Sequence, residues 1–213
     1  MKYDTILFDM DGTLLDTLDD LRSSVNDMLR KYGFPERTTA EIRAFVGNGA
    51  RRLLQRSLPS DFPEERLDAF TEEYRAWYQS HNCIETRPYP GVTELLARLR
   101  AAGVTAAVVS NKPDATTKTL AAKFFPGLPA FGEGNGIPPK PAPEMVRRAL
   151  EQLGKPPEGA VYIGDSEVDV ATARNSGLAL IAVSWGFRDK ELLQSLGAES
   201  IADSAGTLWE MLQ

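Results

Sequence analysis

The chain has 213 residues, of which 42% are hydrophobic, and this is enough for one globular domain or for a domain with an insert. Its 24 basic and 30 acidic residues give a formal net charge of -6 without a dense basic block, so a nucleic-acid partner is not expected. A single Cys and a single His exclude an internal disulfide and a multi-histidine metal site. No apolar run is long enough for a membrane span or a signal-peptide core, so we expect a soluble, cytoplasmic protein with no membrane partner.

The first predicted element is a short buried strand over residues 4–8, directly before the charged sequence Asp9-Met10-Asp11-Gly12-Thr13. The stretch that follows, residues 16–87, shows no convincing strand. Its apolar side chains recur at the spacing of one helix face in three patterns, at 18–32, 42–58 and 67–78. We therefore expect residues 16–87 to form a small helical cap domain, inserted after the first strand.

After a Pro-rich hinge at residues 87–91, the pattern changes to an alternation of helix and strand. Helices are predicted at 91–102, 113–124, 143–153, 167–176 and 189–195, with a last helix near the end of the chain. Strands are predicted at 104–109, 160–163, 178–183 and 200–202, and a long loop precedes the helix at 143. This alternation indicates an α/β fold, a Rossmann-like parallel sheet covered by helices on both faces, formed by residues 1–15 and 88–213.

Polar side chains follow three of the predicted strands. Asp9 ends the first strand, Ser110 ends the strand at 104–109, and Asp165 ends the strand at 160–163. In an open parallel sheet, the ligand site lies beyond the carboxyl ends of the strands. We therefore expect these three groups to converge on one edge of the sheet.

Asp9 and Asp11 are two residues apart, so in an extended chain both carboxylates face the same side. Two like charges this close repel unless a cation lies between them or one of them holds a proton. Phosphoryl transfer through a carboxylate nucleophile requires both of those conditions. The alternative is a solvated turn with Gly12, which a bare D-x-D-G sequence would favour.

Four motifs occur in order at the ends of strands or in adjoining loops: FDMDGTLLDT, VVSNK, the loop that contains Lys140, and GDSEVD. With these motifs, nearly the whole chain resembles the haloacid dehalogenase-like superfamily, in its phosphatase branch with a small helical cap. Within that branch it is most similar to bacterial phosphoglycolate phosphatases. The dehalogenases of the superfamily lack the second Asp of the first motif, so Asp11 counts against that activity.

The resemblance implies a role for each matching residue. Asp9 would be the nucleophile that forms an aspartyl-phosphate, and Asp11 would be the general acid and base. Ser110 would hydrogen-bond the phosphoryl oxygens, and Lys140 would hold the nucleophile and the phosphate by charge. The proline-rich loop around Lys140 is stiff, so it could hold the lysine side chain in one orientation. A lone lysine, however, is more often a surface residue.

The resemblance also implies a Mg²⁺ cofactor. Asp165 would bind it together with the Asp9 side chain and the backbone carbonyl of Asp11, and Asp169 would support the metal site from nearby. For Asp169 there is an equally good alternative, because Ser166 and Asp169 fit the S-x-x-D pattern of a capping box. Oxygen ligands of this kind suit Mg²⁺ better than zinc or copper. The substrate-binding residues would be Thr13, Ser110, Asn111 and Lys140.

The cap is expected to carry specificity, because a mobile lid can exclude water from an open sheet edge. Arg51 and Arg52 follow two glycines in the cap, and they could meet a substrate carboxylate. The alternative is a plain turn followed by a solvated helix face.

The implied partner is a small phosphorylated metabolite, most closely 2-phosphoglycolate, and the protein would act as a monomer or a homodimer. The same core motifs also serve pyrophosphate, sugar phosphates and nucleotides. A phosphomutase would need a further acid or base from the cap, for which Asp19 and Asp20 remain open. A non-catalytic protein that binds a phosphorylated ligand is the other alternative, although it would not need Asp11.

Overall fold

The computed structural model describes residues 1–134 and 136–213. The chain divides into two compact units, one formed by Met1–Leu15 with Pro88–Gln213 and the other by Asp16–Arg87. A two-stranded sheet of β2 (Leu15–Asp16) and β3 (Arg87–Pro88) is formed by the segments that join the units. Within the described residues, no helix is both long enough and apolar enough to cross a membrane.

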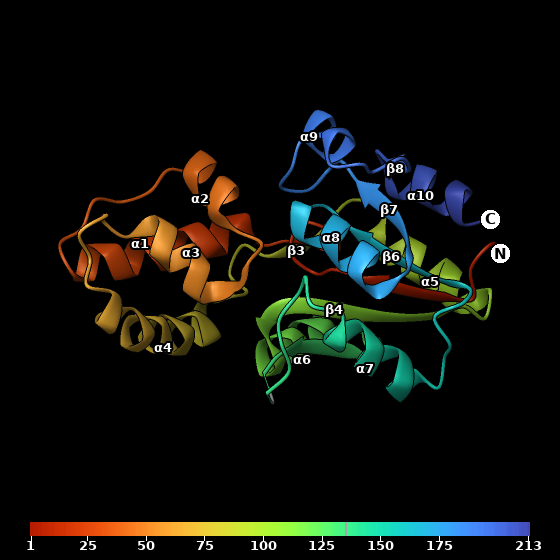
Figure 1. The fold of residues 1–213 in the computed structure, drawn as a ribbon, viewed down its shortest axis with the longest axis horizontal. Helices are drawn as coiled ribbons and strands as arrows, with labels where there is room; N and C mark the ends of the chain where they lie inside the picture. The colour runs from red at the N-terminus through yellow and green to blue at the C-terminus, as the bar shows by residue number, and fades with distance from the viewer. Residues whose placement is uncertain (135) are drawn as a thin grey trace. The chain divides into compact units, whose positions relative to one another are not determined.

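The larger unit is built on a six-stranded sheet with the strand order β5-β4-β1-β6-β7-β8 (Figure 1). Every pairing in this sheet is parallel, which confirms the predicted fold class. The strands are β1 (Thr5–Phe8), β4 (Thr105–Pro113), β5 (Ala130–Glu133), β6 (Ala160–Gly164), β7 (Ala179–Val183) and β8 (Ile201–Ala202).

Strand β1 is an inner strand of the sheet, because β4 pairs with one of its edges and β6 with the other. All four of its residues are buried, as expected for a strand covered on both faces. Leu7 lies in register with Ala107 on β4 and with Tyr162 on β6. These three side chains belong to one hydrophobic core with residues of α7 and α8, so this face of the sheet is sealed by helices.

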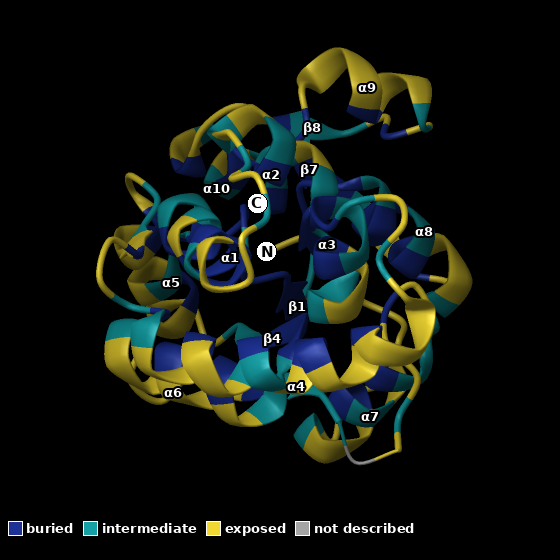
Figure 2. Ribbon diagram, turned by 90° about the vertical axis from the view of Figure 1, so that its left-hand side faces the viewer, coloured by how far each residue is buried: buried dark blue, intermediate teal, exposed yellow. Residues whose placement is uncertain are grey.

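The helices of the larger unit are α5 (Val92–Ala101), α6 (Asp114–Phe124), α7 (Glu144–Leu153), α8 (Glu167–Ser176), α9 (Lys190–Ser195) and α10 (Ala205–Leu212). Helix α5 packs against α10, and α7 packs against α8. In Figure 2 the labelled strand β1 is dark blue, whereas α6 shows a broad yellow face. The sheet is therefore the core, and the helices separate it from solvent.

The smaller unit contains α1 (Leu18–Lys31), α2 (Thr39–Phe45), α3 (Gly49–Ser57) and α4 (Glu64–His81). The apolar pattern over residues 42–58 is divided between α2 and α3, because Gly47 and Gly49 adopt positive φ angles where α2 ends and α3 begins. Asp20 on α1 is 2% exposed, and its carboxylate accepts hydrogen bonds from the backbone N–H groups of Ile84, Glu85 and Thr86. This contact fixes the end of the unit to its first helix.

Two strand predictions need correction. Strand β4 runs to Pro113, four residues beyond the predicted end, so Ser110 lies inside the strand. Strand β5 lies in the segment that was predicted to be a long loop. It is short, its side chains lack clear alternation, and it is held by parallel pairing to β4 at the edge of the sheet.

Candidate active site

The candidate active site lies at the carboxyl ends of β1, β4 and β6. Asp9 follows β1, and its backbone N–H donates to the carbonyl of Ile163 on β6 at 2.8 Å. Asp165 follows β6 directly. Ser110 and Lys112 lie in the last part of β4 and are 1% and 5% exposed. The strand order places β1 between the other two strands, so their polar residues meet at one edge of the sheet.

Asp9 is a buried carboxylate held by two donors on the same oxygen. The backbone N–H of Met10 donates to its Oδ1 at 2.7 Å, and Nζ of Lys140 lies 2.9 Å from that atom. Burial raises the pKa of Asp9 from 3.8 to about 7, although the charge of Lys140 opposes this shift. Ionised Asp9 therefore depends on nearby positive charge.

Asp11 forms an ion pair with Lys112, whose Nζ lies 3.0 Å from Oδ1 of Asp11. The lysine side chain is 3% exposed and that of Asp11 is 17% exposed. The backbone here turns sharply, since the N–H groups of Thr13, Leu14 and Leu15 all point to the carbonyl of Met10. This turn lets both acidic side chains of the D-x-D sequence remain at the end of β1.

The ammonium group of Lys140 contacts three side chains of the site. Its Nζ contacts Asp9 at 2.9 Å, Asp169 at 2.8 Å and the hydroxyl of Tyr162 at 2.8 Å. Burial alone would lower the pKa of Lys140, but the carboxylates of Asp169 and Asp9 outweigh it and raise that pKa well above its usual value. Lys140 is therefore a fixed ammonium.

Asn111 holds the loop that carries Lys140. Its Oδ1 accepts the backbone N–H of Lys140 at 2.7 Å, and its Nδ2 donates to the backbone carbonyl of Lys140 at 2.9 Å. Tyr162 holds the side chain of the same lysine and donates to the carbonyl of Val109 at 3.1 Å. Together, Asn111 and Tyr162 explain how Lys140, a loop residue, reaches the sheet edge with a defined orientation.

Asp165 is fully buried and lies opposite Asp9. Thr13 donates its hydroxyl to Oδ1 of Asp165 at 2.9 Å, and the backbone N–H of Phe187 donates to Oδ2 at 2.7 Å. Burial, followed by the charges of Asp169 and Asp9, raises the pKa of Asp165 well above its usual value. Thr13, which was predicted to bind substrate, is therefore placed against this carboxylate.

Two glycines leave room for Asp165. A Cβ atom at Gly12 would overlap the carboxylate of Asp165, and Gly12 also has a φ of +83°, which strains any other residue. A Cβ atom at Gly186 would meet both Asp165 and the carbonyl of Gly12. These close approaches show that the carboxylate is packed tightly between two loops.

The acidic residues fit a divalent cation. One carboxylate oxygen from each of Asp9, Asp165 and Asp169 lies within 4.8 Å of the others. Buried carboxylates with raised pKa values are costly to ionise together, and a cation with hard oxygen ligands removes that cost. The donor set contains no thiolate or imidazole, so it suits Mg²⁺ better than zinc or copper.

Asp169 differs from the other two carboxylates because it accepts more hydrogen bonds from the groups around it. Oδ2 accepts the hydroxyl and the backbone N–H of Ser166, at 2.6 and 3.1 Å, and the backbone N–H of Asp165 at 3.2 Å. Oδ1 meets Lys140 and the hydroxyl of Tyr162. The structure therefore gives Asp169 the capping contacts that its spacing from Ser166 suggested, together with a contact to Lys140.

The two arginines of the helical unit have partners within that unit. Arg51 forms ion pairs with Glu64 at 2.8 Å and with Asp68 at 2.7 Å. Arg52 donates to Oε1 of Gln55 at 2.5 Å. Both arginines are exposed, so these are surface contacts. Their role in binding a substrate carboxylate stays a prediction.

Lys112 and Tyr162 are two residues of the site with no predicted role. Lys112 stands in the VVSNK motif, and its place two residues after Ser110 was the available signal, since alternate residues of a strand share a face. Tyr162 reads as an ordinary core aromatic of a buried strand. Its hydroxyl contacts Lys140, which is 22 residues away along the chain, so the local pattern gives no sign of this contact.

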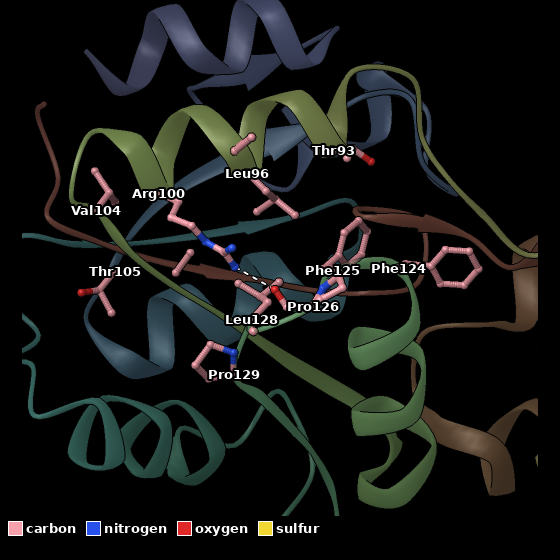
Figure 3. A pocket seen from close by; sticks show the side chains of 13 residues that line it. Thr93, Leu96, Arg100, Val104, Thr105, Phe124, Phe125, Pro126, Leu128 and Pro129 are labelled. Atoms are coloured by element: carbon pink, nitrogen blue, oxygen red, sulfur yellow. Dashed lines mark hydrogen bonds between the residues drawn. The ribbon is translucent and has the colours of Figure 1, made fainter.

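A separate cavity of about 360 Å³ lies between α5 and the segment that follows α6 (Figure 3). Arg100 points into it and donates to the backbone carbonyl of Pro126 at 2.8 Å. Strand β4 reaches this cavity with Thr105, at the opposite end from Lys112. The cavity is therefore distinct from the candidate active site.

Comparisons with known proteins identify relatives of this chain. Residues 6–183 match the family model described as haloacid dehalogenase-like hydrolase. A phosphoglycolate phosphatase of Nitrosospira multiformis is 32% identical over 98% of this chain and 95% of its own length. An N-acetylmuramic acid 6-phosphate phosphatase of Pseudomonas aeruginosa is 29% identical over 100% of this chain and 96% of its own length.

The fold is also found in solved structures. A crystal structure of an inferred phosphoglycolate phosphatase from Lactobacillus delbrueckii subsp. bulgaricus superimposes with a TM-score of 0.92. It is 38% identical, and the superposition covers 100% of this chain and 99% of the other. Both the core unit and the helical unit thus have counterparts of nearly the same length.

Proposed function

This chain belongs to the haloacid dehalogenase-like hydrolase family, and on that premise we propose that it is a Mg²⁺-dependent phosphatase that works through an aspartyl-phosphate on Asp9. The observation that carries the proposal is the buried arrangement of Asp9, Lys140 and Asp165 at one sheet edge, with Asp11 paired to Lys112 beside it. The phosphatase class also agrees with the relatives, whose names describe phosphatases.

In the proposed first half-reaction, a carboxylate oxygen of Asp9 attacks the phosphorus of the substrate. The P–O bond to the leaving group breaks, and Asp11 gives its proton to the leaving oxygen. Lys140 and the hydroxyl of Ser110 hold the phosphoryl oxygens, so charge neutralisation and alignment come from fixed groups. Because Lys140 is held by Asp169 and Tyr162, little reorganisation is needed when the phosphoryl group arrives.

In the proposed second half-reaction, water attacks the phosphorus of the aspartyl-phosphate. Asp11, now ionised, takes a proton from that water, and Asp9 leaves as a carboxylate with inorganic phosphate as the second product. When bound, Mg²⁺ would neutralise charge on the phosphoryl group. Asp9, Asp165 and the backbone carbonyl of Asp11 would hold it, and Asp169 would act by holding Lys140.

For the substrate, we propose 2-phosphoglycolate. The support is the similarity to a phosphoglycolate phosphatase of N. multiformis over nearly the whole chain, together with the motifs of the site. We propose the helical unit, residues 16–87, as a cap that excludes water during the reaction. Arg51 and Arg52 are its candidate contacts to a carboxylate, although ion pairs with Glu64 and Asp68 would have to open for Arg51 to serve.

A second candidate substrate is a sugar phosphate. The similarity to an N-acetylmuramic acid 6-phosphate phosphatase covers 100% of this chain, so the two substrates need a direct comparison. A phosphomutase is a weaker alternative. The carboxylate of Asp20 already accepts hydrogen bonds from residues 84–86 and from the hydroxyl of Thr86, so it has a structural use.

The test of the proposed function is phosphate release by purified protein. The substrate panel would hold 2-phosphoglycolate, N-acetylmuramic acid 6-phosphate, pyrophosphate, other sugar phosphates and nucleotides, each with Mg²⁺ and with a chelator. We expect 2-phosphoglycolate to have the highest kcat/KM, and only with Mg²⁺. The Asp9→Asn variant should fold and release no phosphate. A different preferred substrate would retain the mechanism and reject 2-phosphoglycolate, whereas turnover by Asp9→Asn would reject the nucleophile.

A further inference from the structure

Lys112 is a buried lysine that pairs with Asp11, the proposed proton donor to the leaving group. Its side chain is 3% exposed, and its Nζ is 3.0 Å from Oδ1 of Asp11. Its backbone N–H donates to the hydroxyl of Ser110 at 3.2 Å, so it is tied to the end of β4 next to the proposed phosphoryl contact. A buried ammonium needs an anion beside it, because an unpaired charge is costly to keep away from water.

On the basis of the proposed function, we propose that Lys112 binds the carboxylate that the substrate carries next to its ester oxygen. Lys112 would thereby select phosphate esters of small 2-hydroxy acids. This role deepens the proposed function, since it assigns the carboxylate of the substrate to the sheet edge and not to the arginines of the helical unit.

The distances support this role. As proton donor, Asp11 must bring a carboxyl oxygen within about 3 Å of the ester oxygen, and Lys112 lies about one hydrogen bond beyond Asp11. In an ester of a 2-hydroxy acid, the carboxyl carbon lies two bonds from the ester oxygen, roughly 2.5 Å away. A carboxylate oxygen of such a substrate can therefore come within about 3 Å of the ammonium of Lys112.

Among the described residues, the two other buried cations have different partners. Lys140 is held by Asp9, Asp169 and Tyr162. Arg188 forms a bidentate ion pair with Glu167: Nε donates to Oε2 at 2.6 Å, and Nη2 donates to Oε1 at 3.0 Å. When Asp11 turns a carboxyl oxygen toward the ester oxygen, its contact with Lys112 lengthens, and a substrate carboxylate can take its place without exposing the ammonium.

The experiment compares two substrates that differ in the carboxylate. 2-Phosphoglycolate and ethyl phosphate each carry a phosphate on a two-carbon alcohol, and ethyl phosphate has no carboxylate. For Lys112→Met with Mg²⁺, we expect kcat/KM for 2-phosphoglycolate to fall about 10- to 100-fold more than kcat/KM for ethyl phosphate, as for the loss of a charged hydrogen bond. Lys112→Arg should keep part of the preference. Lys118→Met, which removes an exposed lysine of α6, should keep all of it.

Calorimetric titration of Asp9→Asn with Mg²⁺ provides the same comparison without turnover. Adding Lys112→Met should weaken binding of 2-phosphoglycolate about 10- to 100-fold and leave binding of ethyl phosphate nearly unchanged. Equal losses for the two ligands, in either experiment and in variants that unfold at the wild-type temperature, would overturn the proposal. If the wild type releases no phosphate from any substrate, the proposed function fails, and the titration still decides whether Lys112 binds the carboxylate.

Discussion

Nζ of Lys140 lies 2.9 Å from Oδ1 of Asp9, and this contact joins a loop lysine to the carboxylate at the end of the central strand. Burial raises the pKa of Asp9 to about 7, so the lysine is an important source of the positive charge that favours ionised Asp9, the proposed nucleophile. The contact therefore links the fold of the Lys140 loop to the proposed chemistry.

Lys140→Met should lower kcat by roughly 10²–10³-fold, because one fixed charge at the phosphoryl group is lost. Replacing the ammonium also leaves Asp9 and Asp169 as buried carboxylates without this partner, so the free energy of unfolding should fall by about 3 kcal/mol or more at neutral pH. Steady-state kinetics and urea unfolding measure the two effects. A variant with wild-type kcat would contradict the proposed role of Lys140.

Tyr162→Phe removes one hydroxyl that contacts Lys140, Asp169 and the carbonyl of Val109. We expect kcat to fall about 10-fold and the free energy of unfolding to fall by about 1–2 kcal/mol, since buried partners lose a hydrogen bond. KM should change little, because Tyr162 lies behind Lys140. A loss of stability with unchanged kcat would show that the hydroxyl only supports the core.

Gly12→Ala should abolish activity, because the added Cβ would overlap the carboxylate of Asp165. Gly103→Ala is the matched control: Gly103 also has a positive φ, of +73°, but nothing lies within 4 Å of its Cβ position. Backbone strain should cost each variant about 1 kcal/mol of stability, and Gly12→Ala should lose more because the carboxylate of Asp165 must move. Similar kcat values for the two variants would show that the space beside Asp165 is unimportant.

The stability of the protein should depend on pH and Mg²⁺ together. Folding raises the pKa values of Asp9 and Asp165, so the folded state without metal binds protons that the unfolded chain has released. Its free energy of unfolding should therefore fall as the pH rises from about 4 to about 7. Mg²⁺ requires the ionised carboxylates and replaces those protons, so it should raise Tm more at pH 7.5 than at pH 5.5.

Thermal unfolding at several pH values, with Mg²⁺ and with a chelator, measures this coupling. In Asp9→Asn, the Tm gain from Mg²⁺ should be smaller and should vary less with pH. An effect of Mg²⁺ that is equal at all pH values, or equal in Asp9→Asn, would contradict a site built from these carboxylates.

Most of the fold could be predicted because its elements have strong local patterns. Strand β1 is a short apolar run before charged residues, and helix α1 has a clear apolar face. Strand β5 was missed because its pairing with β4 stabilises a segment with little local signal. The division between α2 and α3 falls at Gly47 and Gly49, a pair of glycines that interrupts the helical pattern of the sequence and adopts positive φ angles in the structure.

The position of the candidate site followed from one geometric rule, because parallel strands bring their carboxyl ends to the same edge. The contacts that orient its residues could not be predicted in the same way. Lys112 meets Asp11 across two strands, and Tyr162 meets a lysine from a distant loop. Such pairs depend on the register of the strands and on the path of the loops. Neither can be predicted from the spacing of residues within one segment.

The proposed reaction depends on an aspartyl-phosphate at Asp9, and acid quenching of the Asp11→Asn variant would detect this intermediate. An aryl phosphate with a good leaving group would be mixed with this variant and Mg²⁺, quenched in acid, and the peptides analysed by mass spectrometry. Because the variant lacks the base that activates water, we expect one phosphoryl group to accumulate on Asp9, and none to appear when Asp9 is also replaced by Asn. Turnover without phosphorylation of Asp9, or phosphorylation at another residue, would exclude Asp9 as the nucleophile.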